Sequence, residues 1–87
     1  GGAIRDVLDG FYDASGKLPC QIDGGLKCFG HPIGASGLRM IYEMYLQLQG
    51  RADERQRGGP VFGMTHNLGG FPSQNVSSIA IVGQYGA

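Results

Sequence analysis

The chain has 87 residues, enough for one small domain, and its 17 glycines and lack of tryptophan leave few large side chains for a compact core. Seven basic and seven acidic residues cancel, so nothing in the charge indicates a nucleic-acid or anionic-membrane partner. No secretory segment precedes Cys20 and Cys28, so we expect reduced thiols in the cytoplasm. The longest apolar run, Val76 to Val82, is too short to span a bilayer, so no membrane partner is expected.

The first half of the chain predicts two helices. Apolar residues at helical spacing indicate an amphipathic helix over Ala3–Asp13. Leu18–Asp23 follows as an extended segment, because the residue before a proline avoids the helical region. A stronger helix is expected over Ser36–Gln49, ended by Gly50. Its apolar stripe comprises Leu38, Ile41, Tyr45 and Leu48, widened by Met40 and Met44.

The second half predicts two strands. Arg51–Pro60 is polar and glycine-rich and is interpreted as an exposed loop, with contact to a nucleotide as the alternative for its charges. Val61–Asn67 and Val76–Gly83 are expected as strands, the second rich in Val and Ile. Leu68–Gln74 would join them as a tight loop.

Gly24–Gly37 is the segment best suited to chemistry. It holds His31 between a glycine and a proline, and a stiffly displayed imidazole suits a catalytic acid or base. The helix that begins after this turn would direct its N-terminal amides and the positive end of its dipole toward the site. The pattern alone is equally compatible with a glycine-rich turn that exposes a histidine.

Met64–Gly70 is a second candidate, because a double glycine after a strand lets the backbone turn and expose its amides. His66 and Asn67 could hydrogen-bond an acyl group there, although the pattern alone favours a structural His66. The two cysteines lack CxxC spacing, so no metal site is expected. Cys28 lies three residues before His31, but that proximity in sequence does not aim a nucleophile.

The string GGLKCFGHPIGASG resembles the GHP motif of the thiolase superfamily. GGLKCFGHPIGASGLRMIYEMYLQLQG and the later THNLGGFPSQNVSSIAIVG together resemble the C-terminal part of thiolases, closest to the archaeal and bacterial branch related to sterol-carrier-protein-type thiolases. The resemblance is specific from Leu18 to Gly83 and looser before it. It implies an α/β fold in which residues 1–87 form a C-terminal segment. This segment would be part of the second half of a thiolase fold, a mixed sheet with packed helices, and not a complete fold.

The resemblance also implies roles for individual residues. His31 would take the proton of a nucleophilic cysteine and help to bind the thioester oxygen. Asn67 stands near the cysteine of the C-x-G motif of biosynthetic thiolases, so it would polarise or position the substrate in the catalytic site. The residues implied to lie beside the acyl-CoA are Gly30, Gly34, Ala35, Ser36, His66, Gly69 and Gly70.

The resemblance leaves two parts of the active site unaccounted for: the nucleophilic cysteine and the motif that supplies the second oxyanion partner. We therefore expect an acyltransferase that condenses or thiolyses coenzyme A thioesters, without a bound cofactor, once this segment is completed by the remainder of the thiolase chain or a complementary subunit. The segment alone is expected to be inactive. A homo- or hetero-oligomer is expected, in which a small zinc-ribbon and OB-fold protein is a plausible partner. The alternatives are a thiolase-like aldolase acting on a β-hydroxyacyl-CoA and a non-catalytic subunit that binds acyl-CoA.

Overall fold

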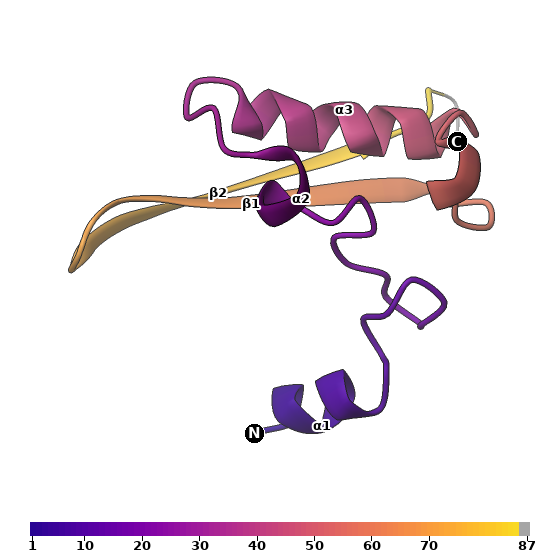
Figure 1. Ribbon diagram of the computed structural model, residues 1–87, viewed down its shortest axis with the longest axis horizontal. Helices are drawn as coiled ribbons and strands as arrows, with labels where there is room; N and C mark the ends of the chain where they lie inside the picture. Colours follow the sequence, from indigo (N-terminus) through magenta and orange to yellow (C-terminus); the bar gives the residue numbers. More distant parts are fainter. Residues whose placement is uncertain (86–87) are drawn as a thin grey trace. The chain divides into compact units, whose positions relative to one another are not determined.

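The computed structural model describes residues 1–85 and divides the chain into two compact units, Gly1–His31 and Pro32–Ala87 (Figure 1). The first unit contains two short helices, α1 (Ala3–Leu8) and α2 (Leu26–Phe29). The second contains, in chain order, a long helix, a single 3-10 turn and two strands. These elements are α3 (Ser36–Leu48), η1 (Asp53–Arg55), β1 (Phe62–Phe71) and β2 (Gln74–Gly83).

The first helix is shorter than expected: α1 ends at Leu8 and not at Asp13. The chain leaves the helix through Gly10, whose φ of 75° lies in the left-handed region that glycine tolerates. Phe11, which the helical pattern included, instead accepts a backbone hydrogen bond from the N–H of Leu18 at 3.0 Å. Leu18–Asp23, predicted to be extended, is irregular: Cys20 N–H also bonds back to the Tyr12 carbonyl, and the chain turns after Gln21, whose φ is 53°.

The glycine-rich segment before His31 contains a helical turn, α2, that the sequence did not predict. Gly24 and Gly25 precede it with φ of 87° and 69°. A Cβ at Gly24 would collide with the side chain of Cys28, so glycine is required there for space as well as for conformation. The Asp23 carboxylate accepts a 3.0 Å hydrogen bond from the N–H of Gly25, which fixes this turn.

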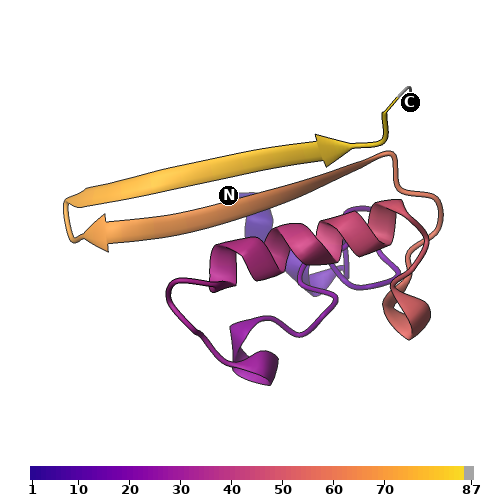
Figure 2. The same ribbon diagram turned by 90° about the horizontal axis from the view of Figure 1, so that it is seen from above.

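In the second unit, α3 lies against one face of an antiparallel hairpin formed by β1 and β2 (Figures 1 and 2). The ladder runs from Phe62 opposite Gly83 to Phe71 opposite Gln74. Only Pro72 and Ser73 lie between the strands, so the expected seven-residue loop is wrong. Proline followed by a residue of positive φ, here 66° at Ser73, suits a two-residue turn, and Gly70 is accommodated within the ladder at a φ of 99°.

Strand alternation assigns the two faces of the hairpin. Gly63 and Thr65 are buried and Asn67 is half-buried, so these positions of β1 face α3. The intervening residues, including His66, therefore face away from α3. The unit thus has two layers, one helix on a two-stranded sheet, and this agrees with an α/β segment that is not a complete fold.

Helix α3 buries only part of the apolar stripe that its spacing predicted: Leu48 is buried, and Met40, Ile41 and Met44 are half-buried. Leu38 is 71% exposed and Tyr45 48% exposed, although both belong to the predicted stripe. The buried residues of the helix are Ser36, Glu43, Gln47 and Leu48. Three of these four are polar: the Ser36 hydroxyl bonds to the turn before the helix, and Glu43 and Gln47 bond to each other and to Arg55 after it. Hydrophobic periodicity does not identify residues that are buried through hydrogen bonds.

Gly63 gives the closest approach of the helix to the sheet. A Cβ at this position would lie 2.7 Å from Sδ and 2.9 Å from Cβ of Met44. We expect Gly63→Ala to force α3 away from the hairpin and to destabilise the fold by about 1–3 kcal/mol through overpacking. Thermal unfolding of the complete protein measures this cost. Gly69→Ala is the matched control, because no atom lies within 4 Å of a Cβ there, and equal Tm values for both variants would contradict the prediction.

No helix within residues 1–85 is both long enough and apolar enough to cross a membrane.

Candidate functional site

The turn that leads into α3 is closed by Ser36. Its hydroxyl donates to the carbonyl oxygen of Pro32 at 3.1 Å, and its own backbone N–H donates to the same oxygen at 2.9 Å. Ser36 is only 5% exposed, and its hydroxyl fixes the path of the chain between Pro32 and the helix. Gly34 and Ala35 are exposed within the turn, where small side chains leave the backbone open to a ligand.

The N-terminus of α3 has no side-chain cap, because Ala35 occupies the N-cap position. Pro32 O accepts from Ala35 and Ser36, and Ala35 O accepts from Arg39. In the part of the chain that the structure describes, the N–H groups of Gly37 and Leu38 donate to no backbone carbonyl outside the helix. Uncapped amides at the positive end of a helix dipole suit an oxyanion or a thiolate.

Asn67 lies beside this helix N-terminus. A Cβ added to Gly37 would be 3.9 Å from Asn67 Nδ2, so the carboxamide is in van der Waals reach of the first turn of α3. The ladder fixes Asn67 opposite Ser78, on the face that packs against the helix. The structure thus brings together two motifs that lie some thirty residues apart in the sequence, the turn after Pro32 and the Asn67 segment.

His66 lies on the opposite face of β1 from Asn67, because successive residues of a strand alternate. Its Nε2 is 2.6 Å from Oγ of Ser77, a residue of β2 on the same face. From the sequence, we expected the side chains of His66 and Asn67 to lie beside the same acyl group. The strand geometry requires a substrate on the Asn67 side to reach His66 through or around the sheet.

The other expected site residues remain predictions. His31 and Gly30 are exposed at the end of the first unit, where Gly30 adopts a φ of 88°. Gly69 and Gly70 are exposed and lie within β1, so their amides belong to a strand and not to the loop that was expected. Cys20 and Cys28 are exposed free thiols, and residues 1–85 contain no cluster suited to a metal ion.

Glu43 is the centre of a polar network that the sequence analysis missed. Its side chain is 3% exposed, and its two oxygens accept hydrogen bonds of 3.0 Å each from Nε and Nη2 of Arg55. Gln47 Nε2 donates to the same carboxylate at 3.2 Å, and Arg39 lies 3.7 Å away one turn earlier. Burial raises the pKa of Glu43, but the hydrogen bonds from Arg55 and Gln47 and the charges of Arg55 and Arg39 lower the pKa overall.

This network attaches the segment after α3 to the helix. Gln47 also accepts a hydrogen bond from the N–H of Arg57 and donates to the carbonyl of Arg55, both at 2.9 Å. Gln56 Nε2 donates in turn to the carbonyl of Gln47 at 2.9 Å. The charged segment, expected to be a solvated loop, is therefore half-buried and fixed at Arg55, Gln56 and Arg57.

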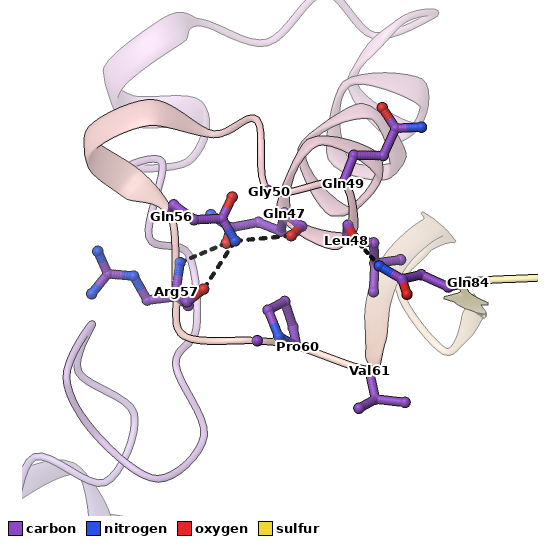
Figure 3. A pocket seen from close by; sticks show the side chains of 10 residues that line it. Gln47, Leu48, Gln49, Gly50, Gln56, Arg57, Pro60, Val61 and Gln84 are labelled. Carbon is purple, nitrogen blue, oxygen red and sulfur yellow. Dashed lines mark hydrogen bonds between the residues drawn. The ribbon is translucent and has the colours of Figure 1, made fainter. Parts of the chain in front are cut away.

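An open hollow of about 520 Å³ lies at the C-terminal end of α3, away from Asn67 (Figure 3). Four of its ten lining residues are glutamines, and the side chains of Gln47 and Gln56 donate hydrogen bonds to backbone carbonyls. Gln84 likewise donates to the carbonyl of Leu48. These hydrogen bonds connect the end of the hairpin and the segment after α3 to the helix.

Residues 1–82 match the model of a protein family described as thiolase C-terminal domain-like. The chain belongs to this family. The match spans both the GHP turn and the Asn67 segment, and it confirms the resemblance on which the expected fold class was based.

The similar proteins include an acetyl-CoA acetyltransferase and proteins named for sterol or lipid transfer. An acetyl-CoA acetyltransferase of Methanothermobacter thermautotrophicus is 47% identical over 66 residues, which are 76% of this chain and 17% of that protein. Sterol carrier protein 2 of Oryctolagus cuniculus is 44% identical over 69 residues, 79% of this chain and 12% of that protein. A non-specific lipid-transfer protein-like 2 of Caenorhabditis elegans is 35% identical over 94% of this thiolase segment and 18% of its own length. The segment thus spans less than a fifth of these relatives. No solved structure matches it significantly.

Proposed function

We propose that this thiolase segment supplies the GHP histidine and the substrate-positioning amide of an acyl-CoA acyltransferase. The substrate is a coenzyme A thioester, and no resident cofactor takes part. His31 acts as the base for a nucleophilic cysteine that lies in another part of the complete protein or in a partner chain. Condensation or thiolysis then proceeds through transfer of the acyl group to and from that cysteine.

The position of Asn67 against the first turn of α3 is the observation that supports this proposal most directly. The helix begins five residues after His31, and its Gly37 and Leu38 amides are uncapped. A thioester oxygen placed here would receive backbone N–H groups at a helix N-terminus together with a side-chain amide. Asn67 carries no titratable proton, so its role is to polarise and position the substrate, while His31 transfers protons.

Ser36 has a positioning role in this proposal. Because its hydroxyl is bonded to the Pro32 carbonyl, it holds the turn in which Gly34 and Ala35 leave the backbone accessible. Gly30, with its positive φ, sets the direction of the chain at His31. Gly69 and Gly70 lie two and three residues beyond Asn67 and keep that part of the hairpin free of side chains.

The assay that tests the proposal uses the complete protein with acetoacetyl-CoA and free coenzyme A. Thiolysis consumes one molecule of each and yields two molecules of acetyl-CoA. Asn67→Ala is expected to lower kcat/KM by about 10²-fold, the effect of removing one oxyanion donor, while Ser78→Ala opposite it on the ladder stays near the parent value.

The same assay separates the alternatives. A thiolase-like aldolase would cleave a β-hydroxyacyl-CoA in the absence of free coenzyme A. A non-catalytic subunit would bind acyl-CoA and show no turnover in either reaction. Equal kcat/KM for parent and Asn67→Ala would overturn the assigned role of the amide.

A further inference from the structure

The side of α3 that faces the hairpin defines the rotation of the helix only weakly. Gly37 and Met44 are seven residues apart, so they lie within about 20° of each other around the helix axis. Gly37 lies beside Asn67 but has no side chain that could fit against it. Met44 covers Gly63 with an unbranched, flexible side chain that adapts to its neighbours. The position of the first turn opposite the Asn67 carboxamide therefore depends on a further restraint.

The polar line of α3, which comprises Ser36, Glu43 and Gln47, provides that restraint. All three residues are buried, and they lie within about 40° of one another, on a side of the helix about 90° from the hairpin. Arg55 donates from Nε and Nη2 to the two oxygens of Glu43 at 3.0 Å each, and its carbonyl oxygen accepts from Nε2 of Gln47 at 2.9 Å. A guanidinium paired with both oxygens of a carboxylate is restrained in direction as well as in distance. Arg55 therefore holds two successive turns of the helix.

The segment that carries Arg55 is itself fixed. Ala52 is fully buried, its N–H donates to Oε1 of Gln56 at 3.1 Å, and its carbonyl accepts from the N–H of Arg55 at 3.1 Å. Gln56 Nε2 donates to the carbonyl of Gln47, and Gln47 Oε1 accepts from the N–H of Arg57, both at 2.9 Å (Figure 3). These bonds keep the backbone of Arg55 in place, so its guanidinium acts on the helix as a fixed support.

We propose that Arg55 is a positioning residue for the thioester site. By holding Glu43 it sets the rotation of α3, which aligns the uncapped amides of the first turn with the Asn67 carboxamide. The reaction that depends on this alignment rests on the proposed function. A rotation of about 25° would move the Cα atoms of the first turn, about 2.3 Å from the helix axis, by about 1 Å. A misplacement of about 1 Å by a distant substitution can cost about 10²-fold in rate.

Thiolysis by the complete protein measures the consequence for the reaction. Arg55→Ala is expected to lower kcat by about 10- to 100-fold with KM within about twofold of the parent, because the alignment matters most in the transition state. Arg51→Ala is the matched control and should keep kcat within about twofold, since Arg51 is exposed and its guanidinium donates to the exposed side chain of Gln49. Equal kcat in the two variants would overturn the proposal. A raised KM at unchanged kcat would place Arg55 at the substrate and would also overturn it.

Chemical rescue separates positioning from a loss of folding. The Arg55 side chain is 37% exposed, so a guanidinium ion can enter from solution the space that Arg55→Ala leaves beside Glu43. Guanidinium at a non-denaturing concentration is expected to restore most of the lost kcat, whereas ammonium has the charge without the planar pair of donors and restores little. A folded Arg55→Ala variant that neither ion rescues contradicts the proposal. If Arg55→Ala does not fold, Arg55→Lys decides: a kcat between zero and the parent value supports positioning by the planar group, and a kcat equal to the parent value overturns it.

The side-chain amide of Asn67 reports the alignment without any turnover. In the complete protein labelled with ¹⁵N at asparagine, its NH₂ signals are identified by their disappearance in Asn67→Ala. Arg55→Ala, or Arg55→Lys in its place, is expected to shift or broaden these signals, whereas Arg51→Ala leaves them unchanged. Unchanged signals in the Arg55 variants would overturn the proposal. Shifted signals in a protein whose parent form has no thiolysis would reject the proposed function alone.

Discussion

His31→Ala is expected to lower kcat for acetoacetyl-CoA thiolysis by the complete protein by about 10²–10⁴-fold, the contribution typical of a positioned general base. In the proposed mechanism the imidazole takes the proton of the nucleophilic cysteine, and alanine would leave that thiol largely protonated at neutral pH. KM should change much less, because the helix amides and Asn67, which we propose receive the thioester oxygen, remain in place. Steady-state kinetics with varied acetoacetyl-CoA give both constants.

Gln49→Ala is the matched control for this experiment. Gln49 is exposed at the other end of α3, so its loss should leave kcat within about twofold of the parent. An unchanged kcat in His31→Ala would remove the histidine from the chemistry. A fall in Tm that accompanies the loss of activity would point instead to a structural role of the exposed turn.

Glu43→Ala is expected to release the segment after α3 from the helix. The substitution removes the acceptor of two hydrogen bonds from the Arg55 guanidinium and of one of the two that Gln47 Nε2 donates, and breaking a buried, hydrogen-bonded pair is strongly destabilising. Because the side chain of Arg55 is 37% exposed, water recovers part of the loss, and we expect about 2–3 kcal/mol. The N–H of Arg57, which donates to Gln47, should exchange with solvent about 30- to 100-fold faster.

Hydrogen exchange of residues 51–58 in the complete protein measures this effect. Glu54→Ala is the control, since Glu54 is an acidic residue of the same segment and is exposed. Equal exchange in the two variants would show that the Glu43 network does not hold the segment.

The same carboxylate predicts a dependence on pH. The pKa of Glu43 is lower in the folded protein than its ordinary value, so the unfolded chain binds a proton at a higher pH than the folded one. Its contribution to stability is therefore complete above the ordinary glutamate pKa and is lost as the pH falls through the lowered one. Denaturant unfolding across the acid range should show this loss, and Glu43→Gln should show a flatter profile.

Part of the candidate site could be predicted from the sequence. Gly30, His31 and Pro32 form a motif that needs no tertiary structure to be found, because its signal lies in adjacent residues. The long helix was also predicted almost to the residue, since its periodicity is local and Gly50 adopts a φ of 69° just beyond its end.

The sequence could not assign the faces of these elements. Hydrophobic spacing correctly placed Leu48 in the buried stripe, but it also placed Leu38 and Tyr45 there, which are exposed. It missed Glu43 and Gln47, which the structure buries. A charged side chain is buried only when partners distant in sequence reach it, and Arg55, twelve residues later, does so. Gly69 and Gly70 were predicted to lie in a loop, but they are part of β1. They are held there by pairing with Val76 and Asn75 of the opposite strand, which the local sequence does not reveal.

Sequence by itself thus determined the family resemblance, the positions of the principal helix and strands, and the histidine proposed as the base. Tertiary structure decided which residues of the Met64–Gly70 segment face the N-terminus of α3. Asn67 faces α3 and His66 faces away, because a strand alternates its side chains and only the packing of α3 tells one face from the other.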